Sequence, residues 1–167
     1  GTLTYNYRQY GSKSWSSYIT SAVTKWNTVS ILPNANELGY ANYTAADIPT
    51  IQSSSSTGNG VSVNISSNNY EDNFVGRYGD GLSVYTSRHF KNGRDSIMSL
   101  NDRKSSGFST AQYVNTVMHE WGHRFGLNHS TNTGALMYTL TTSVNSVNGD
   151  ERRACAYFWN RCYHQGS

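Results

Sequence analysis

The sequence contains little charge, few prolines, few cysteines and no long apolar run. Of its 167 residues, 14% are charged, 2 are Pro and 2 are Cys. No stretch approaches the roughly 20 consecutive apolar residues of a membrane span, so we expect no membrane-spanning segment. The formal net charge is +3, and the basic residues are scattered apart from Arg152 and Arg153, so we expect no nucleic-acid partner.

The low apolar content, 36%, does not indicate disorder. Disordered chains are poor in aromatic residues and strongly charged, whereas 13% of this chain is aromatic. The length suits one domain, since a single core usually organises about 100 to 200 residues. We therefore expect a single domain over residues 1–167 and, because no large apolar patch is evident, a monomer.

The sequence leaves open whether the two cysteines form a disulfide or remain unpaired thiols. Cys155 and Cys162 are seven residues apart, which on one straight helix places their Cα atoms about 10 Å from each other, too far for a disulfide. A disulfide therefore requires that the helix end near Asn160 and that the chain fold back. The sequence is consistent with this disulfide and with two unpaired thiols.

The spacing of apolar residues predicts strands mixed with helices. Alternation predicts strands at 2–8, 47–52, 61–66, 82–90 and 95–101, whereas 68–81 is Gly-rich and is expected to be irregular. Apolar residues at i, i+3, i+4 and i+7 predict helices at 14–30 and 109–125, and a third helix is expected from about Gly149 with Asp150 as a capping residue. One mixed sheet packed on helices accounts for this order, which is an α+β fold.

The chemistry of the chain is concentrated between His119 and His129, in the run His-Glu-Trp-Gly-His-Arg-Phe-Gly-Leu-Asn-His. His119 and His123 are four residues apart, so both imidazoles project from one helix face and can reach one metal ion. Gly126 can adopt a left-handed conformation that ends the helix, and the returning chain lets His129 approach as a third ligand. Three protein ligands with one open position are typical of a catalytic zinc site.

Glu120 adjoins the first ligand but points away from the ligand row. Its carboxylate is therefore expected beside a zinc-bound water, where it can act as the general base in hydrolysis of a peptide bond. Eight residues after His129, Met137 supplies the Met-turn that accompanies this long zinc motif. We expect Met137 to form an apolar floor under the zinc and not to be a ligand, because a thioether binds zinc poorly.

Among metzincins, the zinc peptidases with this motif and a Met-turn, the chain resembles a matrixin, the family of the matrix metalloproteinases and their bacterial relatives. Gly122, Ser130 and the Ala-Leu-Met-Tyr run at 135–138 match that family. Astacins and serralysins carry a Tyr two residues after the Met, where this chain has Thr139. The resemblance covers most of residues 1–150 and is strongest at 115–138.

The resemblance implies a twisted mixed sheet of five strands with three helices, and a substrate cleft across one catalytic zinc. It also implies an edge strand that pairs with an extended peptide and a pocket beside the zinc. In this sequence the edge strand corresponds to Leu82, Ser83, Val84 and Tyr85, and the pocket wall to Asn115, Thr116 and the segment after Tyr138.

Two departures concern further metal ions. Vertebrate matrixins hold a structural zinc with His and Asp residues before the active-site helix, and only His89 remains in that region, so we expect no structural zinc. Glu71, Asp72 and Asp80 are oxygen donors that leave calcium open, although their spacing is not that of an EF-hand.

The sequence therefore predicts a secreted, extracellular zinc endopeptidase that acts on protein or peptide substrates. No basic segment followed by an apolar run stands at its start, so we expect a processed or trimmed chain. The alternative is a matrixin-like toxin or recognition module that keeps the zinc site but acts by binding a partner. Glu120 favours the enzyme, because a binding module needs no general base there.

Overall fold

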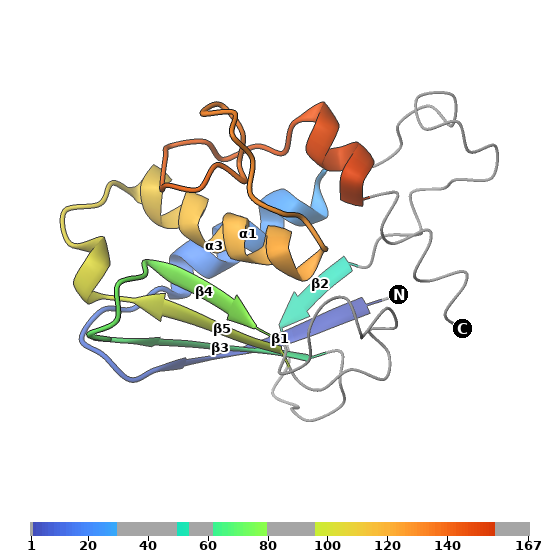
Figure 1. Ribbon diagram of the computed structural model, residues 1–167. Helices are drawn as coiled ribbons and strands as arrows, with labels where there is room; N and C mark the ends of the chain where they lie inside the picture. Colours follow the sequence, from blue (N-terminus) through green and yellow to red (C-terminus); the bar gives the residue numbers. More distant parts are fainter. Residues whose placement is uncertain (1, 30–49, 54–61, 80–95, 156–167) are drawn as a thin grey trace.

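A five-stranded mixed sheet carries the fold, with helices on one of its faces (Figure 1). The computed structural model describes residues 2–29, 50–53, 62–79 and 96–155. The strands are β1 (Thr2–Gln9), β2 (Thr50–Ser53), β3 (Ser62–Asn68), β4 (Gly76–Gly79) and β5 (Ser96–Asn101). The helices are α1 (Ser16–Asn27), the 3-10 helix η3 (Arg103–Ser105), α3 (Thr110–Arg124) and a helical segment at 149–155.

The strands are arranged in the order β2-β1-β3-β5-β4. The pairs β1 with β2, β1 with β3, and β3 with β5 are parallel, whereas β4 runs antiparallel to β5. The expected α+β class and mixed sheet are therefore confirmed. Within the described ranges, no helix combines the length and apolarity that crossing a membrane requires.

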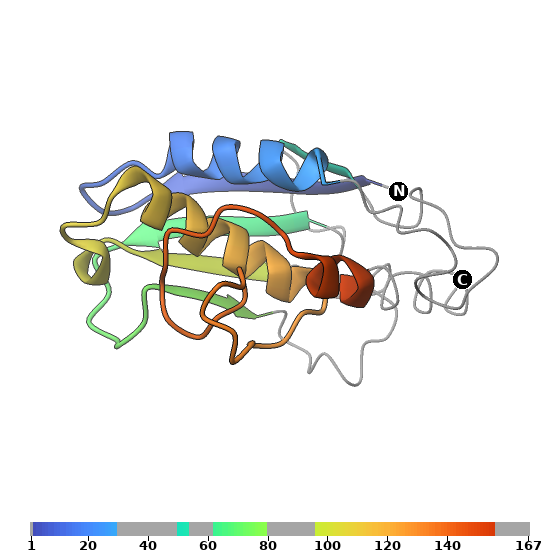
Figure 2. The same cartoon turned by 90° about the horizontal axis from the view of Figure 1, so that it is seen from above.

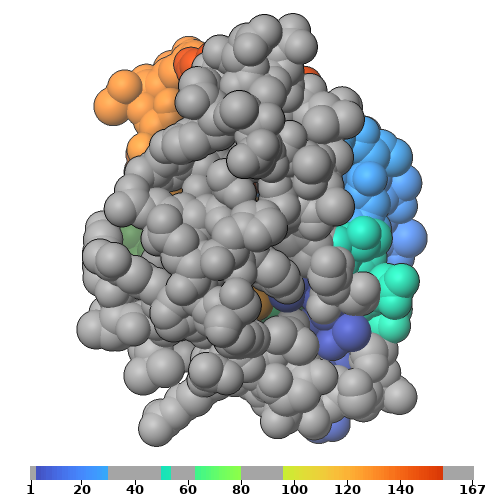
Figure 3. Space-filling view, turned by 90° about the vertical axis from the view of Figure 1, so that its right-hand side faces the viewer, coloured from blue at the N-terminus to red at the C-terminus, as the bar shows by residue number. Residues whose placement is uncertain are grey.

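Helices α1 and α3 lie side by side over the same face of the sheet (Figures 1 and 2). α1 contacts β2, and α3 contacts β4 and β5. In the view from the right-hand side of Figure 1, α1 and β2 adjoin at one margin, and part of the chain after α3 lies at the opposite margin (Figure 3). The buried apolar side chains of the strands are Leu3, Tyr5, Ile51, Val63, Ile65, Met98 and Leu100.

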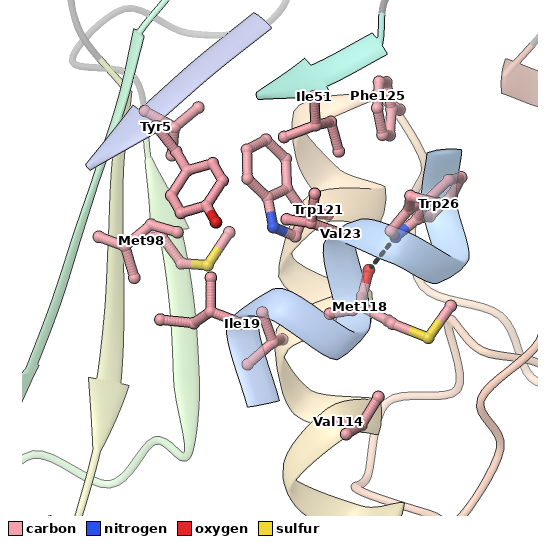
Figure 4. Packing of buried hydrophobic residues seen from close by; sticks show 14 of the residues in the cluster. Tyr5, Ile19, Val23, Trp26, Ile51, Met98, Val114, Met118, Trp121 and Phe125 are labelled. Atoms are coloured by element: carbon pink, nitrogen blue, oxygen red, sulfur yellow. Dashed lines mark hydrogen bonds between the residues drawn. The ribbon is translucent and has the colours of Figure 1, made fainter. Parts of the chain in front are cut away.

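Aromatic side chains join the two helices to each other and to the sheet (Figure 4). The indole Nε1 of Trp26 donates a 3.0 Å hydrogen bond to the carbonyl oxygen of Met118, which links α1 to α3. The ring centroids of Trp26 and Phe125 are 4.8 Å apart, and those of Tyr5 and Trp121 are 6.0 Å apart in an edge-on contact. Burial of each such side chain contributes about 1.5–3 kcal/mol, so one face of α3 is held firmly in the core.

Most of the predicted elements are confirmed to within about three residues. The predicted strands at 2–8, 61–66 and 95–101 correspond to β1, β3 and β5, and the helices at 14–30 and 109–125 to α1 and α3. The strand at 47–52 overlaps β2, with 47–49 outside the described residues, and 82–90 lies wholly outside them. The third helix begins at residue 149, but its cap is Asn148 and not Asp150, since Asn148 Oδ1 accepts a 2.8 Å hydrogen bond from the backbone N–H of Glu151.

The expectation that 68–81 is irregular is wrong for β4. Its sequence, Gly-Arg-Tyr-Gly, has two glycines and no apolar alternation, so local propensity gives no strand signal. β4 forms through its partner strand. Tyr78 lies opposite Met98 of β5, and the Tyr78 hydroxyl donates a 2.8 Å hydrogen bond to Ser96 Oγ.

One buried amide organises the loop that leads into β4. Asn101, at the end of β5, donates from Nδ2 to the carbonyl oxygens of Asp72 (3.2 Å) and Phe74 (2.8 Å). Its Oδ1 accepts from the backbone N–H groups of Tyr70 and Arg103, each at 3.1 Å. The path from β3 to β4 therefore depends on both ends of this side chain.

The substitution Asn101→Asp tests this role. Aspartate cannot donate to the two carbonyl oxygens and places a carboxylate against them. We expect the free energy of unfolding, measured by urea denaturation, to fall by about 2–4 kcal/mol. The control Asn73→Asp, at an exposed position of the same loop, should change it by less than about 0.5 kcal/mol. Equal losses in the two variants would contradict the organising role.

Candidate metal centre

Three histidines converge at the end of α3. One ring nitrogen from each of His119, His123 and His129 lies within 4.8 Å of the other two. The ring centroids are 4.8 Å apart for His119 and His123, 5.2 Å for His119 and His129, and 4.9 Å for His123 and His129. In the part of the chain that the structure describes, this is the only such group of three or more His, Cys, Asp or Glu side chains. The three predicted ligands are thus brought together.

Both ends of α3 are fixed by local hydrogen bonds. At the start, Ser109 Oγ accepts from the N–H of Gln112 (3.2 Å) and Gln112 Oε1 accepts from the N–H of Ser109 (2.9 Å), which is a capping box. At the end, Gly126 has a φ of 90°, and its N–H donates to the carbonyl oxygen of His123 at 3.0 Å. The next N–H, at Leu127, donates to the carbonyl oxygen of Gly122 at 2.9 Å, which completes a Schellman motif.

The Met-turn, residues 135–138, contacts the segment that follows His129. It is closed by a 3.2 Å hydrogen bond from the N–H of Tyr138 to the carbonyl oxygen of Ala135. The N–H of Ser130, directly after His129, donates to the carbonyl oxygen of Met137 at 2.8 Å. In Figures 1 and 2 this segment, in orange, lies next to α3. The Met-turn therefore positions the third histidine.

Backbone carbonyl groups orient two of the rings. His119 Nδ1 is 3.0 Å from the carbonyl oxygen of Leu136, and His123 Nδ1 is 2.9 Å from that of Leu127. A carbonyl oxygen only accepts hydrogen bonds, so each Nδ1 carries the proton and each Nε2 presents a lone pair. This is the arrangement in which an imidazole binds a metal through Nε2.

The histidine cluster fits a zinc ion. Tetrahedral zinc with Zn–N bonds of 2.0–2.1 Å holds its nitrogen ligands about 3.3 Å apart, and His123 Nε2 and His129 Nε2 are 3.2 Å apart. Burial lowers the pKa of His119 to about 4, and it also lowers the pKa of His123. Both rings are therefore neutral near pH 7, which is the form that binds a metal.

Met137 packs directly against the helix that carries the first two histidines. A Cβ atom at Gly122 would lie 2.4 Å from the sulfur of Met137, so the approach requires a glycine. Met137 is buried, and no larger residue could stand at 122 without displacing it. Met137 therefore lies against the turn of α3 between His119 and His123, and its role as a floor under the zinc stays a prediction.

Glu120 is buried beside β4. Its residue is 5% exposed, and this burial raises the pKa of Glu120 to about 8. A Cβ atom at Gly76 of β4 would lie 3.0 Å from Cγ and Oε1 of Glu120 and from Cγ2 of Thr116. β4, the strand that the sequence does not predict, therefore borders the Glu120 carboxylate. Gly76 of this strand leaves room for the Glu120 side chain.

Hydrogen bonds fix the first residue of the predicted pocket wall, Asn115. The Asn115 amide is buried, with Nδ2 donating to the carbonyl oxygen of Val144 at 2.7 Å and Oδ1 accepting from the N–H of Thr142 at 3.1 Å. These two hydrogen bonds connect α3 to the segment after the Met-turn. Thr116 is also buried, and Tyr138 is half-buried.

The remaining assignments lie partly or wholly outside the described residues. Leu82, Ser83, Val84 and Tyr85 are among these, so the predicted substrate strand stays a prediction.

Of the oxygen donors considered for calcium, Glu71 and Asp72 are exposed, and Asp72 Oδ2 is 3.7 Å from Arg77 Nη2, so the described residues give calcium binding no support. Cys155 is buried and Cys162 is not described, so both cysteine states stay open.

Glu151 is a residue of the site that sequence reasoning missed. Its Oε2 accepts a 2.8 Å hydrogen bond from the backbone N–H of Met137 in the Met-turn. The spacing of Asn148 and Glu151 is that of a capping box, which could have predicted the bond from Glu151 to the N–H of Asn148, observed at 3.1 Å. No sequence pattern near Glu151 predicts its hydrogen bond with the N–H of Met137.

Comparisons with known proteins agree with this geometry. A family model described as Matrixin, Peptidase_M10, matches residues 2–155. The comparison with curated protein sequences found no match. Among solved structures, the crystal structure of metalloproteinase-II from Bacteroides fragilis is similar in fold, with a TM-score of 0.55 and 17% identity. The similarity covers 94% of this chain and 53% of that one, so the chain spans about half the length of that protein.

The substitution Gly126→Ala tests the turn that returns His129 to the helix. Alanine in the left-handed conformation costs about 1–2 kcal/mol, so we expect a loss of that size in the free energy of unfolding and weaker zinc binding. The control Gly134→Ala, at an exposed site where a Cβ meets only ordinary contacts, should change neither. Zinc titration and thermal unfolding measure both effects, and wild-type values for Gly126→Ala would show that the turn is not required.

Proposed function

The chain belongs to the matrixin family, and on this basis we propose that it is a zinc-dependent endopeptidase that hydrolyses peptide bonds of protein substrates. The observation that carries the proposal is the convergence of three histidines, two of them with Nε2 lone pairs presented by carbonyl-bonded rings on a helix in which the buried Glu120 directly follows His119. The family assignment supports a metallopeptidase, and the donor set supports zinc.

The residues divide the chemistry between them. His119, His123 and His129 hold the metal, and bound zinc supplies a Lewis acid that polarises the scissile carbonyl and acidifies water. Glu120 accepts at its carboxylate the proton of the attacking water and delivers it to the nitrogen of the leaving amine. Burial raises the pKa of Glu120 to about 8, and the positive charge of bound zinc beside it would favour the ionised form that accepts this proton.

The substrate is an extended peptide that passes the outer strand of the sheet and crosses the metal. Within the described ranges β4 is the outer strand on the side of Glu120, which supports this direction of approach. Residues 82–85, and the wall of Asn115, Thr116 and Tyr138, are the parts we propose for side-chain selection. The small number of charged residues and the abundance of polar ones support an enzyme that is secreted and acts outside the cell.

The substitution Glu120→Gln separates an enzyme from a recognition module with the same metal site. Glutamine keeps the shape but cannot accept the proton, so we expect cleavage of a denatured protein to fall by about 10²- to 10⁴-fold with one zinc ion still bound. The control Glu71→Gln changes an exposed carboxylate and should cleave like wild type. Mass spectrometry of the products gives both rate and cleavage preference. If the wild type binds zinc but cleaves nothing, the chain is a recognition module.

Metal removal tests the identity of the ion. A chelator should abolish cleavage and lower the melting temperature, because a ligand at 100 times its Kd stabilises the folded state by about 2.7 kcal/mol. Zinc should restore both, and calcium alone should restore neither. Recovery with calcium alone would contradict the assignment of zinc to the three histidines.

A further inference from the structure

Glu151 has an anionic side chain that is almost removed from water. The residue is 7% exposed and lies in the helical segment 149–155. Both carboxylate oxygens accept backbone hydrogen bonds, Oε2 from the N–H of Met137 at 2.8 Å and Oε1 from the N–H of Asn148 at 3.1 Å. The second bond belongs to the helix cap, whereas the first reaches into the Met-turn. A cap alone does not explain a bond to a turn that lies before the helix.

The peptide group that Glu151 contacts is also the one that orients His119. The N–H of Met137 and the carbonyl of Leu136 belong to one planar peptide group. Its oxygen is 3.0 Å from His119 Nδ1, and its N–H donates to Glu151. The carboxylate and the imidazole are therefore joined through a single peptide group, in the order carboxylate, N–H, C=O, Nδ1–H.

We propose that Glu151 is a positioning residue for the metal centre, which acts on His119 through the Leu136–Met137 peptide group. The inference rests on the proposed function, since it concerns the same zinc ligand. A negative charge at the N–H end polarises the peptide group and makes its oxygen a stronger acceptor, because hydrogen bonds in series strengthen one another. A stronger bond at Nδ1 holds the proton there, fixes the ring and makes Nε2 a better donor to a metal.

The same bond also fixes the Met-turn against the C-terminal helix. The carbonyl of Met137, on the next peptide group, accepts from the N–H of Ser130 beside His129. Loss of the Glu151 bond would therefore loosen the turn that serves two of the three ligands. Both effects predict weaker metal binding, although Glu151 itself does not touch the metal.

The substitution Glu151→Gln removes the charge and keeps the size of the side chain. We expect zinc affinity, measured by competition with a chromophoric chelator, to fall by about 10-fold, the lower end for partners of metal-binding histidines. Two controls separate the causes. Asp150→Asn removes a charge from the neighbouring position, where the carboxylate is 89% exposed and pairs with Arg153. Asn148→Ala removes the side-chain cap and leaves the bond to Met137. Both controls should bind zinc within about 2-fold of wild type.

A measurement on the wild-type chain covers the case in which Glu151→Gln does not fold. Met137 and Asn148 donate to the same carboxylate, but only Met137 shares its peptide group with the carbonyl bonded to His119. We therefore expect zinc to shift the amide NMR resonance of Met137 more than that of Asn148. Equal shifts, wild-type zinc affinity in a folded Glu151→Gln, or an equal loss in Asn148→Ala would overturn the inference. If the wild type binds no zinc, the proposed function itself fails.

Discussion

The hydrogen bond between His119 Nδ1 and the carbonyl oxygen of Leu136 joins the two parts of the chain on which the site depends. On one side is α3, whose apolar face is fixed in the core through Trp26 and Trp121. On the other side is the Met-turn, which holds the segment of His129 through Ser130. This bond sets the distance between helix and turn, and it keeps the proton of His119 away from the nitrogen that faces the cluster. The cluster forms where the two parts meet.

The local features of this arrangement could be predicted from the sequence. Two histidines four residues apart on a helix share one face, whatever the rest of the fold does. Ser109 caps the helix, and Gly126 ends it in a conformation with a φ of 90°, as a glycine at that position indicates. Each of these features depends on residues only a few positions apart, where spacing alone determines geometry.

The long-range features could not be predicted, because the interactions that create them join distant segments. β4 has no strand propensity and forms on β5, and Gly76 then borders Glu120. The family resemblance assigns Asn115 to a pocket wall, and the fold also uses its amide to hold the segment that contains Thr142, which no sequence pattern indicates. Glu151 shows a capping pattern along the chain, whereas its bond to the Met-turn exists only in the folded protein.

Glu120 and Glu151 show how two buried residues of one type acquire different properties. Glu151 accepts hydrogen bonds from two backbone N–H groups, which fix the position of its carboxylate. Burial is the cause that raises the pKa of Glu120 to about 8. The two donors to Glu151 belong to different segments, the Met-turn and the start of the helical segment 149–155, so Glu151 suits a fixed scaffold. At Glu120 burial opposes ionisation, and the positive charge of a bound zinc ion would favour it, so the proposed base depends on the proposed metal.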